Sequence, residues 1–116
     1  MIAPLVTQGE IERQLFAIGR ALEEQTDVFA QAARTAAVAE ADYKLNVAQA
    51  WLDVAVEFPR ATVVERNARA EVACVVELRG WKIAQASRDS AKEALLSFRA
   101  RLDSLRSLLA SVRGQT

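Results

Sequence analysis

Apolar side chains recur at alternate steps of three and four residues between Ile11 and Tyr43, and no proline interrupts this stretch. This spacing returns a side chain to the same side of an α-helix about once per turn, which is the pattern of a coiled-coil seam. The row consists of Ile11, Leu15, Ile18, Leu22, Gln25, Phe29, Ala32, Ala36, Ala39 and Tyr43 and then, after a slip of one position, of Val47, Ala50 or Trp51, Val54 and Phe58. The sequence therefore predicts one long helix whose supercoil loosens where the slip acts as a stutter.

The ends of this helix are marked by local signals. Thr7 and Glu10 have the spacing of a capping box, in which each side chain accepts a hydrogen bond from the backbone amide of the other residue. Pro59 lacks an amide donor and disfavours helical backbone at Phe58, the residue before it. We therefore predict a helix over residues 8–57.

A second helix is signalled almost immediately. The segment Thr62-Val63-Val64-Glu65 has the same capping-box spacing, and Gly114 is placed to cap the far end. These signals predict a turn over residues 58–62 and a helix over 63–113. Its apolar row consists of Cys74, Leu78, Trp81, Ala84, Ser87 and Ala91, followed by Leu95, Phe98, Leu102, Leu105, Leu109 and Val112.

A turn this short makes the second helix run back antiparallel beside the first, as an αα-hairpin. With the turn centred near residue 60, position i lies opposite about position 120 − i. This register sets Leu15 against Leu105, Ile18 against Leu102, Leu22 against Phe98 and Phe29 against Ala91. It also sets Arg106 and Arg99 against Gln14 and Ala21, which carry no charge.

The predicted fold class is all-α, a long antiparallel two-helix hairpin of coiled-coil type. Among the 116 residues only 6% are aromatic and two are proline, whereas good helix formers are abundant. The length suits one domain, which we place at residues 7–116 behind an N-terminal arm, residues 1–6.

Two helices alone do not enclose a core, so a rod of this length leaves many apolar side chains partly exposed. A second copy is the simplest cover, and we expect a homodimer that forms a four-helix bundle over part of its length. The alternative is a monomer in which one helix breaks and the chain folds into a three-helix bundle. Gly80 is the likeliest break or kink, since glycine costs about 1 kcal/mol in a helix interior, and Gly19 is a weaker candidate.

The first residues, Met1 to Val6, have no basic start, and no apolar run approaches the roughly 20 residues that cross a bilayer. We therefore expect a protein of the cytoplasm that makes no contact with a membrane. Cys74 is the single cysteine, which excludes an internal disulfide and a multi-cysteine metal site. Its apolar neighbours favour a buried thiol over a reactive one.

The sequence contains no histidine, so the commonest general base and metal ligand are missing. Glycine-rich phosphate loops and zinc spacings are also missing. Acidic residues that might act alone, namely Glu23, Glu24, Asp27, Glu40 and Asp42, are better explained as solvated surface. We therefore predict that the protein is not an enzyme, has no catalytic or metal-binding residue, and binds no cofactor or small-molecule substrate.

Charge is unevenly distributed along the chain. Residues 1–57 contain four Lys/Arg and nine Asp/Glu, a net charge of −5, whereas residues 58–116 contain eleven and six, a net charge of +5. One interpretation is that the acidic helix and the basic helix stabilise antiparallel pairing. Another is that some of the basic side chains meet phosphates or an acidic partner.

The second interpretation rests on Lys92, Arg99, Arg106 and Arg113, which follow one another at seven-residue steps, with Arg88 and Arg101 nearby. We take these four residues, called the basic stripe below, as candidate nucleic-acid contacts. The total charge of zero argues against strong binding to duplex DNA.

Three aromatic residues are candidates for an interface. Trp51 and Trp81 have the ring faces needed to stack on single-stranded bases, but such residues more often anchor a core or a dimer interface. Tyr43, at the slip, is interpreted in the same way. We predict that Tyr43, Trp51 and Trp81 lie at a dimer or partner interface.

Several stretches together resemble a family of small, uncharacterised helical proteins encoded by tailed bacteriophages. They are Ala41-Asp42-Tyr43-Lys44, Ala48-Gln49-Ala50-Trp51-Leu52, Thr62-Val63-Val64-Glu65-Arg66-Asn67-Ala68 and Arg101-Leu102-Asp103-Ser104-Leu105-Arg106-Ser107-Leu108. Such proteins are often encoded near genes for single-strand annealing, recombination or replication. The resemblance implies an accessory role in phage DNA metabolism, in the cytoplasm of a bacterial host, and supplies no catalytic residues. The chain departs from the family at Phe58-Pro59-Arg60-Ala61, where relatives tend to have a turn containing glycine.

Two functional hypotheses follow. The first is a non-enzymatic binding protein that assists phage recombination or replication by handling single-stranded DNA through the basic stripe. The second is a protein–protein interaction module, a scaffold or an inhibitor that occupies a host nuclease or defence complex. Its surface would be the acidic side of the first helix or the exposed Trp and Val positions.

Overall fold

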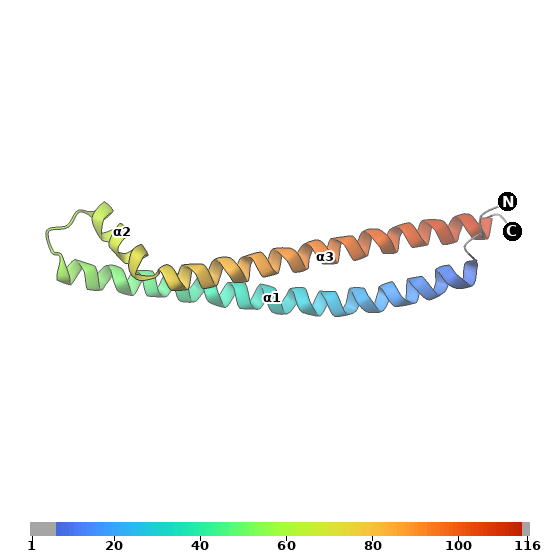
Figure 1. The fold of residues 1–116 in the computed structure, drawn as a ribbon, viewed down its shortest axis with the longest axis horizontal. Coiled ribbons are helices and arrows are strands. Elements are labelled where there is room, and N and C mark those ends of the chain that lie inside the picture. The colour runs from blue at the N-terminus through green and yellow to red at the C-terminus, as the bar shows by residue number, and fades with distance from the viewer. Residues whose placement is uncertain (1–6, 115–116) are drawn as a thin grey trace. The chain divides into compact units, whose positions relative to one another are not determined.

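The structure, a computed structural model, describes residues 7–114, which are helical apart from short connections (Figure 1). The elements are α1 (Gln8–Glu57), α2 (Val63–Ala73) and α3 (Val75–Gly114), and no strand occurs within the described range. The all-α prediction is therefore confirmed. The predicted N-terminal arm, residues 1–6, lies outside the described residues.

Helix α1 begins at its capping box and ends one residue before Phe58. The Thr7 hydroxyl accepts from the Glu10 amide at 3.1 Å, and the Thr7 amide donates to Glu10 Oε2 at 3.4 Å. At the other end, the Phe58 amide still donates to the Val54 carbonyl at 2.7 Å. Pro59 comes next, has no amide to continue the pattern, and so terminates the helix.

The second capping position is also formed. Thr62 has extended backbone angles, φ −70° and ψ 165°, and its hydroxyl accepts from the Glu65 amide at 3.2 Å. Arg66 Nη2 donates to the Pro59 carbonyl at 2.8 Å, which joins the first turn of α2 to the preceding loop. The loop after α1 is therefore held by side-chain hydrogen bonds at the start of α2.

The helix predicted over residues 63–113 is not continuous, because α2 ends at Ala73 and α3 begins at Val75. Cys74, between them, has φ −110° and ψ 23°, and its amide donates to the carbonyls of Glu71 and Val72. Valines at 72, 75 and 76 surround the break, and β-branched side chains lower helix propensity.

The prediction that Gly80 is the likeliest place for the second helix to break is wrong, because the helix is interrupted at Cys74 instead. Gly80 lies inside α3, and no described glycine has a positive φ angle. Glycine permits unusual backbone angles without imposing them, so a helix with good neighbours on both sides continues through it. Gly19 likewise lies inside α1.

The chain divides into two compact units, and α1 and α3 contribute to both. Unit 1 contains residues 1–30 and 90–116, and unit 2 contains residues 31–89. That residues 7–116 form a single hairpin domain therefore stays a prediction.

Unit 1 pairs the first part of α1 with the last part of α3. Arg113 Nη2 lies 3.3 Å from Glu12 Oε1, and Gln25 Nε2 donates to the Ala91 carbonyl at 3.1 Å. Since residue numbers rise along one helix as they fall along the other, the two segments run antiparallel. Its most buried apolar residues are Ile11, Ile18, Ala91 and Leu95.

Unit 2 is built from the rest of α1, all of α2 and the start of α3. Its buried residues are Ala36 and Val54 on α1, Ala70 on α2 and Cys74 at the break between α2 and α3. The ring of Tyr43 on α1 stacks on the ring of Trp81 on α3. Within this unit, α1 therefore packs against α2 and against the first part of α3.

The apolar row predicted for α1 is buried or half-buried at every position from Ile11 to Phe58. On the second row one residue differs, since Ser87 is exposed and Arg88 is half-buried instead. The predicted register, in which the numbers of facing residues add to about 120, can be compared with three observed contacts. The sums are 125 for Glu12–Arg113, 116 for Gln25–Ala91 and 124 for Tyr43–Trp81. Ala91 meets Gln25, one turn away from Phe29.

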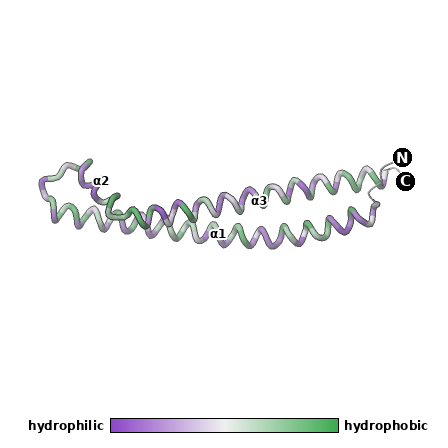
Figure 2. The backbone as a smooth tube through the Cα atoms, in the orientation of Figure 1, coloured by the Kyte–Doolittle hydropathy of each residue, from purple (hydrophilic) through white to green (hydrophobic). Residues whose placement is uncertain are grey.

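Both units leave a large part of their apolar side chains uncovered. In Figure 2 hydrophobic and hydrophilic positions alternate along all three helices. A single hairpin through the whole chain and its assembly into a four-helix bundle stay predictions.

Within residues 7–114, no helix is both long enough and apolar enough to cross a membrane.

Candidate functional site

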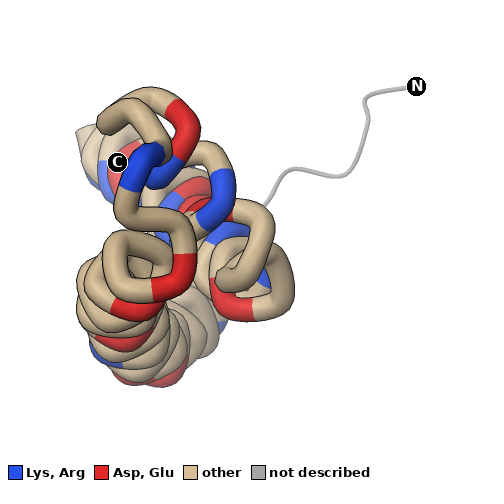
Figure 3. The backbone as a smooth tube through the Cα atoms, turned by 90° about the vertical axis from the view of Figure 1, so that its left-hand side faces the viewer, with Lys and Arg blue, Asp and Glu red and all other residues tan. Residues whose placement is uncertain are grey.

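The basic stripe lies on α3 in unit 1, and all of its members are exposed. Seven residues make nearly two helical turns, so Lys92, Arg99, Arg106 and Arg113 follow one side of the helix. In the end-on view of Figure 3, both basic and acidic positions occur on the part of the molecule that faces the viewer. The stripe is therefore a local feature, as unit 1 contains seven Lys/Arg and seven Asp/Glu.

The members of the stripe differ in their partners. Arg113 forms an ion pair with Glu12 across the two helices, at 3.3 Å. Arg106 reaches only Asp103 of its own helix, at 4.0 Å, and both side chains are largely exposed. Within residues 7–114, Lys92 and Arg99 have no ion pair or side-chain hydrogen bond.

The expectation that the stripe meets no acid on α1 is thus wrong at Arg113. The ion pair with Glu12 supports the interpretation that charges hold the helices together at this end of unit 1. Lys92, Arg99 and Arg106 have no acidic partner on α1, and their charges are directed to solvent. We call these three the open stripe.

The two neighbouring arginines lie in different surroundings. Arg88, in unit 2, is half-buried and pairs with Asp89 at 3.3 Å. Arg101 lines a hollow of about 280 Å³ in unit 1 together with Gln14, Ala100, Ser104 and Leu105. Arg101 does not extend the open stripe, because two residues place it about 200° around the helix from Arg99. Arg88 is not counted with it, because Arg88 is half-buried, belongs to unit 2 and is already paired with Asp89.

The predicted interface aromatics make contacts inside unit 2. The ring centroids of Tyr43 and Trp81 lie 5.4 Å apart with planes inclined by 28°, and Lys82 Nζ lies 4.5 Å from the Trp81 centroid. Both aromatic residues are half-buried. Their place at a dimer or partner interface stays a prediction.

The ring of Trp51 is covered by an arginine side chain and not by another aromatic ring. The Arg66 guanidinium carbon lies 5.6 Å from its ring centroid, and the Nε atom of Arg66 is buried without a hydrogen-bond partner. A cation over an indole face is an attractive contact. The interactions of Arg66 with Trp51 and with the Pro59 carbonyl hold α2 against the end of α1.

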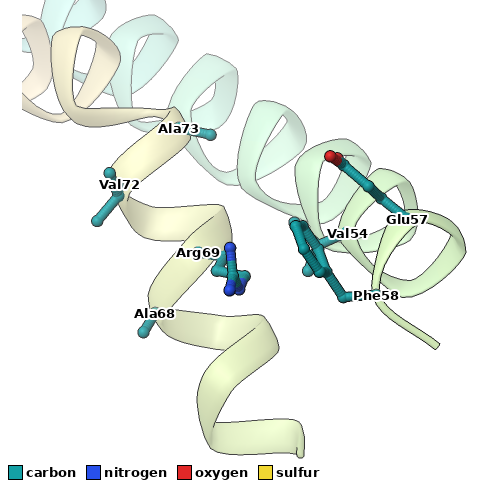
Figure 4. Close-up of a pocket in the computed structure, with 7 residues that line it drawn as sticks. All are labelled: Val54, Glu57, Phe58, Ala68, Arg69, Val72 and Ala73. Carbon is teal, nitrogen blue, oxygen red and sulfur yellow. The ribbon is translucent and has the colours of Figure 1, made fainter. Parts of the chain in front are cut away.

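A pocket of about 490 Å³ opens between the end of α1 and α2 in unit 2 (Figure 4). Its lining consists of Val54, Glu57, Phe58, Ala68, Arg69, Val72 and Ala73. The Arg69 guanidinium carbon lies 3.9 Å from the Phe58 ring centroid, so this arginine and Glu57 are the charged groups of a mainly apolar wall. The pocket exists because α2 ends at Ala73 and does not continue into α3. In the sequence, the only feature that could have indicated this break is the cluster of valines at 72, 75 and 76.

The described residues offer little chemistry. Burial raises the pKa of the Cys74 thiol, and the nearby Glu77 carboxylate raises it further, so the nucleophilic thiolate is disfavoured. Between residues 7 and 114, no group of three or more His, Cys, Asp or Glu is arranged to hold a metal ion.

No protein-family model matches the sequence, and comparisons with curated proteins and with solved structures give no significant match.

Proposed function

We propose that the chain is a non-enzymatic helical binding protein of bacteriophage type that assists DNA recombination or replication by contacting single-stranded DNA. The observation that carries the proposal is the open stripe, in which Lys92, Arg99 and Arg106 are exposed and have no acidic partner on α1. Three cations along one side of a helix span about 21 Å, at 1.5 Å per residue over fourteen residues. That length suits contact with several phosphates of a flexible strand.

The charge balance of the chain determines how strongly it is expected to bind DNA. The total charge is zero, so long-range attraction to nucleic acid is weak and binding depends on local contacts. Each phosphate contact with a single strand contributes about −0.7 to the slope of log K against log salt, so three contacts give a slope of about −2. The family resemblance described above supplies the biological setting.

The experiment is a titration of labelled single-stranded and duplex DNA, followed by fluorescence anisotropy at salt concentrations from about 50 to 200 mM. The test protein carries Lys92→Gln, Arg99→Gln and Arg106→Gln. A matched control carries Arg13→Gln, Arg20→Gln and Arg34→Gln, which remove the same charge from exposed positions on α1. Helicity of each protein is checked by circular dichroism.

We expect the original chain to prefer single strands with a salt slope near −2, the test protein to lose most of this slope, and the control to keep it. Equal loss in the test and control proteins, or no binding by the folded original chain, would show that the proposal is wrong.

A second function is favoured by a separate observation, the exposure of large apolar side chains. Phe16, Val56 and Val64 are 70%, 83% and 77% exposed, and many other valines and leucines are similarly uncovered. Such surface is typical of a protein that binds another protein, here a scaffold or an inhibitor of a host nuclease or defence complex. Affinity capture from nuclease-treated host lysate, followed by cross-linking, tests it: one stoichiometric partner cross-linked at these positions supports this function.

A further inference from the structure

Helix α1 carries a second apolar row within unit 2, on the side turned away from α3. Its positions follow one another at alternate steps of three and four residues, as in the buried row. The members are Val38, Ala41, Leu45, Ala48, Leu52 and Ala55, which we call the outer row. Ala55 is half-buried and the others are exposed, with values of 60% for Val38, 69% for Leu45 and 56% for Leu52.

The position of Leu45 shows that the two rows lie on opposite sides of α1. Leu45 is nine residues from Ala36 and nine from Val54, which is about two and a half turns in each direction. Ala36 and Val54 are 2% and 8% exposed and belong to the core of unit 2. Leu45 therefore points away from that core, and no charged residue occupies the outer row between Val38 and Ala55.

Large and small residues alternate along the outer row. If a second copy lies antiparallel against it, with residue numbers of facing positions adding to 93, Val38 meets Ala55, Leu52 meets Ala41, and Leu45 meets Ala48. Every large side chain then faces an alanine, so the helix axes can approach closely along the whole row. In a parallel pair each residue meets itself, and leucine layers hold the helices apart at the alanine layers.

The flanking residues fit the same arrangement. At the flanking positions on the two edges of this pair, the nearest residue numbers add to 91 and to 95 instead. Asp42 therefore lies near Gln49 of the second copy and Lys44 near Trp51 of the second copy, so like charges do not meet along either edge. The antiparallel relation is also a two-fold axis, in which both copies use the same surface. A pattern that is complementary to itself under this operation favours a second copy over an unrelated partner.

We propose that two copies of the chain pair antiparallel through the outer row of α1. This pair contains residues 38–55 of each helix, a length of roughly 25 Å. It buries Val38, Leu45 and Leu52, three large apolar side chains that are more than half exposed in the single chain. It does not involve the open stripe, so it stands or falls independently of DNA binding. It also differs from a dimer through Tyr43 and Trp81, which stack on each other between α1 and α3 on the side opposite the outer row.

The first test is the mass of the full chain in solution, measured by light scattering over protein concentrations from about 1 to 200 μM. We expect the mass to rise from 12.7 kDa to twice that value. Leu45→Glu should shift the transition at least about tenfold in concentration or abolish it, because the charge is buried in the pair but exposed in the single chain. Ile83→Glu is the matched control, since Ile83 on α3 is also 69% exposed.

The second test measures orientation by cross-linking and introduces no charge. In a Cys74→Ala background, Val38→Cys and Ala55→Cys proteins are prepared separately and oxidised alone or mixed. The antiparallel pair predicts disulfide-linked dimers in the mixture and little from Val38→Cys alone, whose two thiols are then about 25 Å apart. A monomer at every concentration, a dimer unchanged by Leu45→Glu, or efficient linking of Val38→Cys to itself would each overturn the proposal.

Discussion

The ring of Tyr43 on α1 stacks on the ring of Trp81 on α3, with centroids 5.4 Å apart and planes inclined by 28°. Tyr43 is the residue at which the apolar row of α1 slips by one position, so the stack fills the place where regular seam packing is interrupted. Offset aromatic pairs of this kind contribute about 0.5–1.5 kcal/mol beyond the area they bury.

This stack gives the first prediction. Tyr43→Ala and Trp81→Ala should each lower the free energy of unfolding by about 2 kcal/mol, less than for fully buried aromatics because both are half-buried. The double variant should be less destabilised than the sum of the single variants by about 0.5–1.5 kcal/mol. Urea unfolding at one fixed protein concentration measures all four proteins. Strict additivity would contradict a favourable stack, and Tyr43→Ala combined with Leu102→Ala in unit 1 is the pair expected to be additive.

The start of α2 gives the second prediction. The Thr62 hydroxyl accepts from the Glu65 amide at 3.2 Å, so Thr62→Ala leaves this amide without its partner. The free energy of unfolding should fall by about 1 kcal/mol, whereas Thr62→Ser should retain most of it. Thermal unfolding followed by circular dichroism compares the three proteins. An equal effect of the alanine and serine substitutions would mean that the methyl group, and not the hydrogen bond, is responsible.

The sequence predicted the bounds of α1 because its signals are local. A capping box at Thr7 and a proline at 59 act through backbone hydrogen bonds a few residues away, and the periodic row identifies the buried side of the helix. The same reasoning missed the break at Cys74, which is associated with burial of Ala70 and Cys74 in unit 2. Tertiary packing of this kind has no strong local signature.

Two further differences have a similar origin. Steps of three and four are both allowed in an apolar row, so the path from Ala84 to Ala91 can pass through Ser87 or Arg88. In the structure Arg88, and not Ser87, occupies the half-buried position of the row. Its long aliphatic stem can cover apolar surface while its guanidinium group pairs with Asp89. The outer row was missed because α1 has apolar residues on two sides, and periodicity alone does not say which side is covered.

Gly80 gives the third prediction. An added Cβ at this position meets nothing within 4 Å, and the residue lies in the interior of α3 with an ordinary φ angle. Gly80→Ala should therefore raise the free energy of unfolding by about 1 kcal/mol, the difference in helix propensity. Gly19→Ala in α1, also with nothing within 4 Å, should behave in the same way. Chemical denaturation measures both, and destabilisation by Gly80→Ala would indicate a break or hinge at that residue.

Cys74 gives the fourth prediction. The residue is 4% exposed, and burial together with the Glu77 carboxylate raises the pKa of its thiol. Reaction with a thiol reagent at pH 8 should be at least about tenfold slower in the folded protein than in denaturant, since it requires local opening around the break between α2 and α3. The time course of labelling is followed by absorbance. Equal rates in the folded and unfolded proteins would show that the thiol is accessible.

Glu40 gives the fifth prediction, a pH dependence. Lys44 Nζ donates to Glu40 Oε1 at 2.8 Å, and this hydrogen bond and charge lower the pKa of the Glu40 carboxyl below 4.5, with smaller contributions from Arg88 and Lys82. Because the pKa is lower in the folded chain, the carboxylate stabilises the fold above pH 4.5, and this stabilisation is lost as the pH falls through the folded value. The gain is small because both side chains are exposed. Glu40→Gln should therefore be slightly less stable than the original chain from pH 7 to about pH 5 and should approach it at pH 3. Urea unfolding at each pH measures the difference, Glu93→Gln controls for the loss of one negative charge, and a difference that stays constant down to pH 3 would contradict the interaction.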